Sequence, residues 1–161
     1  MLTSGDVLNP RQFFDQYVLP CVTDWELDPL NIRKALIAIS QIDILADHVI
    51  IHQHPDFTRV QVGNVRKATE QNTPIRLLIR DVHDTHKHGP LQRPTATITT
   101  GERPKLERRG EVFQPNVFQN LFQVGTPVLE IVQDDGTKHL VENVITDALT
   151  YWEGELSSLG L

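Results

Sequence analysis

The pattern of apolar and polar positions changes near residue 90. Before that point, apolar residues recur every three or four positions, which is the spacing of helices with one buried face. Three of these runs begin with a capping side chain followed by proline: Asn9-Pro10, Asp28-Pro29 and Thr73-Pro74. This order is typical of helix starts, because the side chain accepts hydrogen bonds from the first free N–H groups. The pattern predicts four helices, over about residues 10–19, 29–53, 57–71 and 74–88.

The second of these predicted helices is apolar around most of its circumference. Its apolar positions are Ile32, Ala35, Leu36, Ile39, Ile42, Leu45, Val49 and Ile50. The polar positions form one narrow stripe through Lys34, Gln41, His48 and His52. A helix of this kind is normally buried by several neighbours. The sequence therefore predicts an N-terminal four-helix bundle over about residues 10–89, which the helix at 74–88 closes.

The second half of the chain has the composition of strands followed by one helix. Residues 95–100 and 110–113 are rich in strand-forming residues. Residues 128–132 and 138–141 flank Gln133-Asp134-Asp135-Gly136-Thr137, a strong hairpin signal. A last helix is predicted over about 142–157. The expected fold is α+β, with the bundle, a small antiparallel sheet and a C-terminal helix packing back, all in one domain over 1–161 with a strand-rich part at about 91–161.

Composition and charge narrow the class of protein. The 161 residues are 39% hydrophobic and 22% charged, as in globular proteins. The net charge of −6 argues against nucleic acid as a general partner. Cys21 is the single cysteine, which suits a reducing compartment. The first residues lack the pattern of a signal peptide, and Asp43 and Asp47 interrupt the longest apolar run, so we expect a cytoplasmic protein and no membrane span.

Six of the seven histidines fall in two clusters, at positions 48–54 and 83–88. His48 and His52 have the i,i+4 spacing of a metal-ligand pair on a helix. They share their stripe with Lys34 and Gln41, however, and a solvated face explains such a stripe. We therefore predict no metal site and no cofactor.

Two carboxylates and one imidazole are predicted to point into the bundle. Asp43 and Asp47 continue an apolar row of the second helix, and His86 follows Ile79 and Val82 on the apolar side of the fourth. A buried carboxylate needs a partner, so Asp43 or Asp47 is expected to pair with His86. The opposite face of the fourth helix carries a basic stripe, formed by Arg76, Arg80, His83 and Lys87.

Residues 80–86, Arg-Asp-Val-His-Asp-Thr-His, also resemble the active-site motif of HEPN-type ribonucleases. That motif has an arginine, a polar residue, and a histidine after four to six intervening positions. The resemblance, which covers at most residues 10–89, implies a helical bundle that dimerises and cleaves RNA without a metal. It would make Arg80 the group that stabilises phosphate charge, Asp81 the group that holds the geometry, and His86 the group that moves the proton.

Two hypotheses of different classes follow. The first is a non-catalytic binding or assembly module of unknown partner, which could be a homodimer. The second is a HEPN-like metal-independent ribonuclease of toxin or defence type, the one case in which RNA would be a partner. The ribonuclease requires Arg80 and His86 exposed together, facing a cleft or a two-fold axis, whereas the module predicts His86 buried against Asp43 or Asp47 and Arg80 free in solvent.

Overall fold

The computed structural model describes residues 8–89, 91–92, 95–98, 105–109 and 128–161, with the backbone alone described at 105–109. The helices before the sheet are α1 (Pro10–Phe13), the π-helical turn η1 (Phe14–Val18), α2 (Leu19–Glu26), α3 (Ile32–Gln53), α4 (Arg59–Glu70) and α5 (Pro74–His88). They are followed by β1 (Lys105–Arg109), β2 (Val128–Val132), β3 (Lys138–Leu140) and α6 (Val141–Ser158). The predicted α+β class is confirmed.

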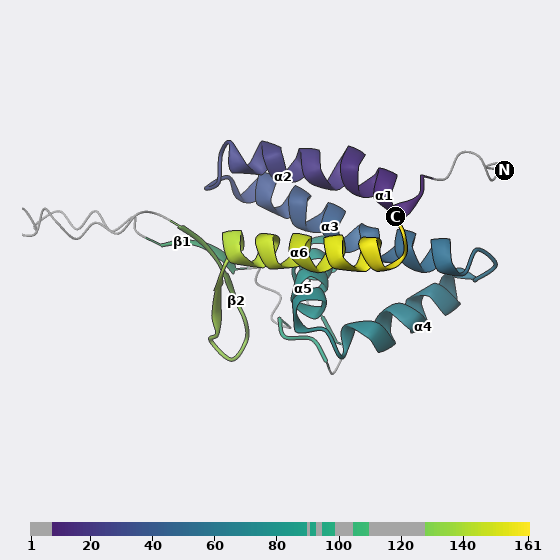
Figure 1. Cartoon of the computed structure of the whole chain (residues 1–161). Coiled ribbons are helices and arrows are strands. Elements are labelled where there is room, and N and C mark those ends of the chain that lie inside the picture. The colour runs from purple at the N-terminus through teal and green to yellow at the C-terminus, as the bar shows by residue number, and fades with distance from the viewer. Residues whose placement is uncertain (1–7, 90, 93–94, 99–104, 110–127) are drawn as a thin grey trace, which may run out of the picture.

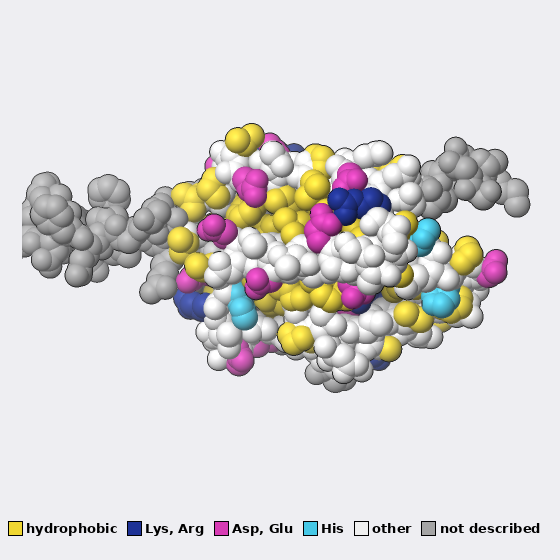
Figure 2. All heavy atoms as spheres, viewed as in Figure 1, with side chains coloured by type: hydrophobic (Ala, Val, Ile, Leu, Met, Phe, Trp, Pro, Cys, Tyr) yellow, Lys and Arg dark blue, Asp and Glu magenta, His cyan; other side chains and the backbone are white. Residues whose placement is uncertain are grey.

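The long helix α3 runs through the middle of the molecule. In Figure 1, α6 crosses in front of it, α1 and α2 lie above, and α4 and α5 lie below. Its buried side chains include Ile39, Ile42 and Leu45, which are fully enclosed. Phe14 and Leu156 reach the same core from the first and the last helix. Figure 2 shows hydrophobic side chains along the seams above and below α6, while charged side chains are scattered over the surface.

The helix starts follow capping chemistry, although not always at the predicted residue. Asn9 accepts a hydrogen bond from the N–H of Gln12 at 2.8 Å, and the Gln12 side chain caps in return. The helix that begins there continues to Glu26, so the predicted end at residue 19 is wrong. Pro20 does not break it, because it lies in the first turn of α2, directly after the wider π-helical turn.

Two other predicted caps are replaced. The side chain of Asn31, and not Asp28, caps α3 by accepting from the N–H of Lys34 at 3.2 Å, so this helix begins three residues later than predicted. At the start of α5, the Thr73 hydroxyl donates to the Thr69 carbonyl of the preceding helix and caps nothing. Pro74 nevertheless occupies the first turn of α5 as predicted.

The strands form a small antiparallel sheet in the order β1-β2-β3. The predicted hairpin is confirmed: Ile131 faces His139 across β2 and β3, and Gly136 in the connecting turn has a φ of +85°. The predicted strand at 95–100 is wrong over its described residues 95–98, because Thr97 donates its N–H to Asp81 and not to a neighbouring strand. The predicted strand at 110–113 lies outside the described residues.

The length and composition of α3 would suffice to cross a membrane, and no other helix in the described part of the chain has this property. Half of its most apolar stretch is buried inside the fold. Central helices of water-soluble proteins meet the same criterion, so this is weak evidence for a membrane span.

Candidate functional site

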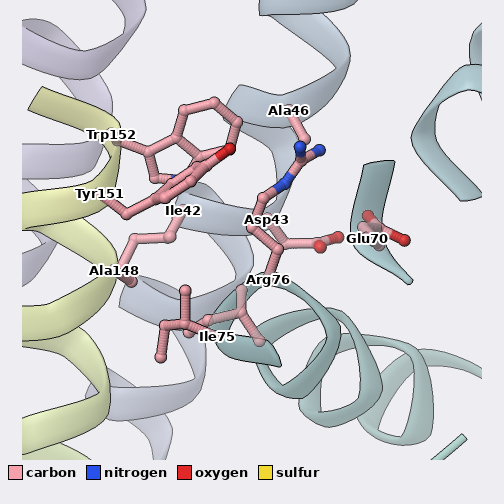
Figure 3. Close-up of a pocket in the computed structure, with 10 residues that line it drawn as sticks. Ile42, Asp43, Ala46, Glu70, Ile75, Arg76, Ala148, Tyr151 and Trp152 are labelled. Carbon is pink, nitrogen blue, oxygen red and sulfur yellow. The ribbon is translucent and has the colours of Figure 1, made fainter. Parts of the chain in front are cut away.

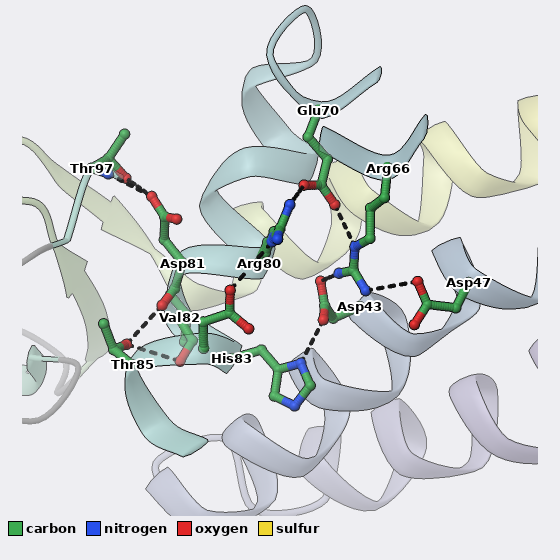
Figure 4. A network of polar contacts seen from close by, with 11 residues as sticks. Asp43, Asp47, Arg66, Glu70, Arg80, Asp81, Val82, His83, Thr85 and Thr97 are labelled. Atoms are coloured by element: carbon green, nitrogen blue, oxygen red, sulfur yellow. Dashed lines mark hydrogen bonds and ion pairs between the residues drawn. The ribbon is translucent and has the colours of Figure 1, made fainter. Parts of the chain in front are cut away.

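A network of charged side chains joins α3, α4 and α5 (Figure 4). Its centre is Arg66, on the face of α4 that packs against α3. One terminal nitrogen of Arg66 donates to Asp43, the other to Asp47 at 3.0 Å, and Nε donates to Glu70 at 2.6 Å. A planar guanidinium with five N–H groups is well suited to hold several carboxylates at once.

The network continues from α4 to α5 through Glu70. Its second carboxylate oxygen accepts from Arg80, and Nε of Arg80 in turn donates to Asp84 at 3.2 Å. On the α3 side, Oδ2 of Asp43 is hydrogen-bonded to Nδ1 of His83 at 2.5 Å. Each helix thus contributes at least one charged side chain that contacts another helix.

The interior members of the network are almost fully enclosed. Asp43, Arg66 and Glu70 are buried, whereas Arg80 and His83 are partly exposed. Burial alone would raise the pKa of Asp43, but the hydrogen bond with His83 and the charge of Arg66 lower it below its usual value. Burial disfavours the cation of Arg66, yet the charges of Asp43 and Glu70 raise its pKa. The network therefore consists of paired charges.

Asp81 lies on another side of α5 and is fully buried. Its Oδ2 accepts the backbone N–H of Thr97 at 2.5 Å and the Thr97 hydroxyl at 2.7 Å. These two contacts hold the segment after α5 against the helix, as Figure 4 shows. Asp81 and the charge network thus serve different contacts of the same helix.

The predicted pairing of His86 with Asp43 or Asp47 is wrong. His86 is exposed, and His83 is the histidine that contacts Asp43. The buried face of α5 is turned toward Asp81 and Thr85, because the segment containing Thr97 covers that side. This orientation of α5 places His83 against α3 and leaves His86 at the surface.

The expectation of a solvated basic stripe on α5 is also wrong in part. Arg80 and His83 lie in the network, and of the four stripe residues only Lys87 is exposed. Asp47 was expected inside the bundle; it pairs with Arg66, but its side chain is 43% exposed.

Arg66 and Glu70 were not predicted as site residues from the sequence. In the sequence, Val62, Arg66 and Glu70 follow one another at i,i+4 spacing, which puts them on one face of α4. The structure shows that all three residues of this face are buried.

Arg76, one turn before Arg80, has a different environment (Figure 3). Its guanidinium lies over the rings of Trp152 and Tyr151, 5.0 Å and 5.9 Å from their centroids. Its buried Nε has no hydrogen-bond partner among the described residues. The pocket that it lines with Ile42 and Ala148 has a volume of about 10 Å³, enough for one water molecule. This pocket is too small for a substrate.

The histidines of the first cluster lie in separate environments. His48 stacks on Phe13 with ring centroids 4.0 Å apart, while His52 is exposed. Within the described ranges, no group of three or more histidine, cysteine or acidic side chains is placed to hold a metal ion.

Chemically, the site offers a histidine whose Nδ1 is fixed by a carboxylate, next to two arginines whose charges are already paired. Such a histidine could exchange a proton through its other nitrogen.

No protein-family model, no curated protein and no solved structure matches this chain.

Proposed function

We propose that this chain is a non-catalytic binding or assembly module, in which the charged side chains of α3, α4 and α5 hold the scaffold together. His83 takes the place against Asp43 that the module gave to His86, and Arg80 is paired and not free in solvent, so the proposal no longer rests on those two expectations. One observation carries it instead: the three residues of the ribonuclease-like motif have three separate environments. Arg80 is paired with Glu70 and Asp84, Asp81 is buried beneath Thr97, and His86 is exposed.

The environment of Arg80 argues against phosphate binding. A catalytic arginine must have N–H groups ready for the charge that develops on the substrate. Arg80 already donates to two carboxylates, those of Glu70 and Asp84, so its positive charge is compensated, and drawing its guanidinium toward a phosphate would weaken the contact with the buried Glu70. Leaving a buried carboxylate without one of its cations is costly. This favours a structural role for Arg80.

The environment of His86 is equally unfavourable for proton transfer. A general acid or base works best when a second group fixes its ring orientation. His83 has such a group in Asp43, whereas the described neighbours of His86 line a groove formed by Ile32, Arg33, Leu36, Ile37, Ser40 and Gln41. The arrangement therefore supports a scaffold better than a reaction centre.

The scaffold of this module would be the four-helix bundle expected from the sequence, formed by residues 10–26 with α3, α4 and α5. Support comes from the network itself, since it links α3 to both α4 and α5 through paired charges. A cytoplasmic location and the absence of a cofactor belong to the same proposal.

The alternative is a HEPN-like metal-independent ribonuclease that uses Arg80 and His86. Its support is that both side chains remain accessible from one helix, since Arg80 is 22% exposed and His86 lies at the surface. In this alternative, Asp81 would hold the helix geometry through Thr97.

An RNA cleavage assay in the presence of EDTA separates the two proposals. The wild type, His86→Ala and His83→Ala would be incubated with a mixed-sequence single-stranded RNA, and the products resolved on a denaturing gel. The module predicts that all three proteins leave the RNA intact. Cleavage by the wild type that is lost in His86→Ala would overturn the module and establish the ribonuclease.

A further inference from the structure

One buried hydrogen-bond donor of the helical part has no protein partner. It is Nε of Arg76, for which no group in the described part of the chain acts as acceptor. The guanidinium of an arginine stays protonated in proteins, so this N–H cannot be lost by deprotonation. A buried donor without an acceptor costs free energy, and the cost is higher when the donor is charged. Nε of Arg76 therefore needs an acceptor that the described side chains do not supply.

The aromatic rings of α6 fix the position of this donor. The guanidinium of Arg76 lies 5.0 Å from the ring centroid of Trp152 and 5.9 Å from that of Tyr151. Figure 3 shows the guanidinium beside the Trp152 ring. Cation–π contacts of this kind hold a guanidinium against the rings. Because turning Arg76 toward a carboxylate would give up both contacts, the acceptor must come to Nε.

The pocket that Arg76 lines has space for one small molecule. Its volume of about 10 Å³ corresponds to a single water molecule. Ile42 and Ala148 give part of its wall an apolar character, whereas Asp43 and Glu70 give another part a polar character. A buried water normally has two to four polar partners, and these side chains together with Arg76 can supply them.

The two carboxylates that line this pocket lie next to each other. One terminal nitrogen of Arg66 donates to Oδ1 of Asp43, and the adjacent Nε of Arg66 donates to Oε1 of Glu70 at 2.6 Å. The remaining oxygens accept from Arg80 on Glu70 and contact His83 on Asp43. A carboxylate oxygen has two lone pairs, so each of these oxygens can accept one further hydrogen. One molecule in the pocket can therefore donate to both carboxylates.

The polar groups of the pocket determine which molecule fits. The occupant must accept a hydrogen bond from a cationic N–H and donate hydrogens to carboxylates. An anion such as chloride accepts from Arg76 but would be repelled by Asp43 and Glu70. A metal cation would be repelled by Arg76 and cannot accept its hydrogen. Water both accepts and donates, and bridges polar groups that do not contact each other directly.

From these constraints we propose that the pocket binds one water molecule, which accepts from Nε of Arg76 and donates one hydrogen to Asp43 and the other to Glu70. The water joins α6, through the rings that hold Arg76, to the charge network of α3, α4 and α5. The site does not depend on the choice between module and ribonuclease, because Arg80, Asp81 and His86 do not line the pocket.

A high-resolution crystal structure of the wild type tests the proposal directly. Electron density for one water should lie about 2.7–3.2 Å from Nε of Arg76 and within hydrogen-bond reach of both carboxylates. A pocket without density would overturn the proposal. The same holds for an Arg76 side chain that leaves Trp152 and pairs directly with Asp43 or Glu70.

Nuclear magnetic resonance of the full chain tests the site in solution. The Nε–H signal of Arg76 is identified by its disappearance in Arg76→Lys. In the wild type, this signal should show a cross-peak to water with opposite signs in NOE and ROE spectra, as a bound water produces. A cross-peak with the same sign in both spectra would mean that the proton exchanges with solvent or meets only short-lived surface water, and would overturn the proposal.

Filling the pocket should displace the water. Ala148→Val adds two methyl groups to the pocket wall, so the water cross-peak of Arg76 should be lost. Ala68→Val is the matched control, because Ala68 is exposed on α4 and does not line the pocket, and it should keep the cross-peak. A folded Ala148→Val variant that retains the full cross-peak would overturn the assigned position. If circular dichroism shows that Ala148→Val is unfolded, the wild-type density and cross-peak decide.

Discussion

Arg66 on α4 and Asp43 on α3, twenty-three residues apart, form a buried ion pair at the centre of the helical part. Arg66 carries one positive charge but donates to three carboxylates, those of Asp43, Asp47 and Glu70. Buried charges of this kind contribute little net stability relative to apolar packing, but removing one partner is expensive. The pair therefore favours one placement of α4 on α3.

Replacing Arg66 with methionine should lower the free energy of unfolding by about 3–5 kcal/mol, because two nearly buried carboxylates lose a shared cation. Urea denaturation followed by circular dichroism measures this change. Lys67→Met is the matched control, since Lys67 is the next residue and is exposed, and it should change stability by less than about 0.5 kcal/mol. Equal effects of the two substitutions would show that the network does not stabilise the fold.

Thr97→Val should lower the free energy of unfolding by about 1 kcal/mol. The substitution removes the hydroxyl that donates to Asp81 and leaves the backbone N–H contact in place. Thr95→Val, two residues away and exposed, should have no effect. Hydrogen exchange offers a second measurement: the Thr97 amide should exchange slowly in the wild type and faster in Asp81→Ala. An unprotected amide in the wild type would contradict the contact.

Stability should depend on Asp43 at acidic pH. Burial alone would raise the pKa of Asp43, but His83 and Arg66 lower it below the value in the unfolded chain, which is about 3.9. The unfolded chain then binds the proton more readily, so the stability that Asp43 contributes is present above about pH 4 and is lost as the pH falls through the lowered folded pKa. Asp43→Asn should therefore show a shallower loss of stability below pH 4 than the wild type.

The control for this pH dependence is Asp56→Asn, because Asp56 is exposed in the turn after α3. Its stability should fall with pH as steeply as that of the wild type. An Asp43→Asn variant with the wild-type slope would mean that the ion pair and the His83 contact do not favour the ionised carboxylate.

Much of the fold could be predicted from local sequence patterns. The α5 start at Pro74 and the hairpin around Gly136 depend on chemistry within a few residues, and both were predicted. The end of the first helix was not predicted, because a π-helical turn before Pro20 depends on packing and has no simple sequence signal. The prediction of a strand at 95–100 was wrong for a similar reason. Threonine favours strands, but Thr97 donates to Asp81, which is sixteen residues away in the sequence.

The candidate site was harder to predict than the fold. Periodicity places Asp43 toward the interior correctly, and the need for a partner follows from its burial. Which histidine it contacts depends on how α5 is rotated about its own axis. His83 and His86 are only three residues apart, so a small rotation decides which of them faces α3. The main partner, Arg66, comes from α4, for which the sequence predicted a helix over about 57–71 but no inward-pointing charge. The periodicity of one helix predicts which of its faces is buried. It does not predict which charged side chains of two packed helices will contact each other.

The free energy of unfolding of Arg80→Met, compared with that of Arg76→Met, tests the structural role of the network most directly. Arg80 pairs with Glu70 and Asp84, whereas Arg76, one turn earlier, stacks on Trp152 and pairs with no carboxylate among the described residues. We predict that Arg80→Met loses about 2–3 kcal/mol, because Glu70 keeps only Arg66, and that Arg76→Met loses about 1 kcal/mol or less. An Arg80→Met variant as stable as the wild type would contradict the account, because it would leave Arg80 available for catalysis and without a role in the scaffold.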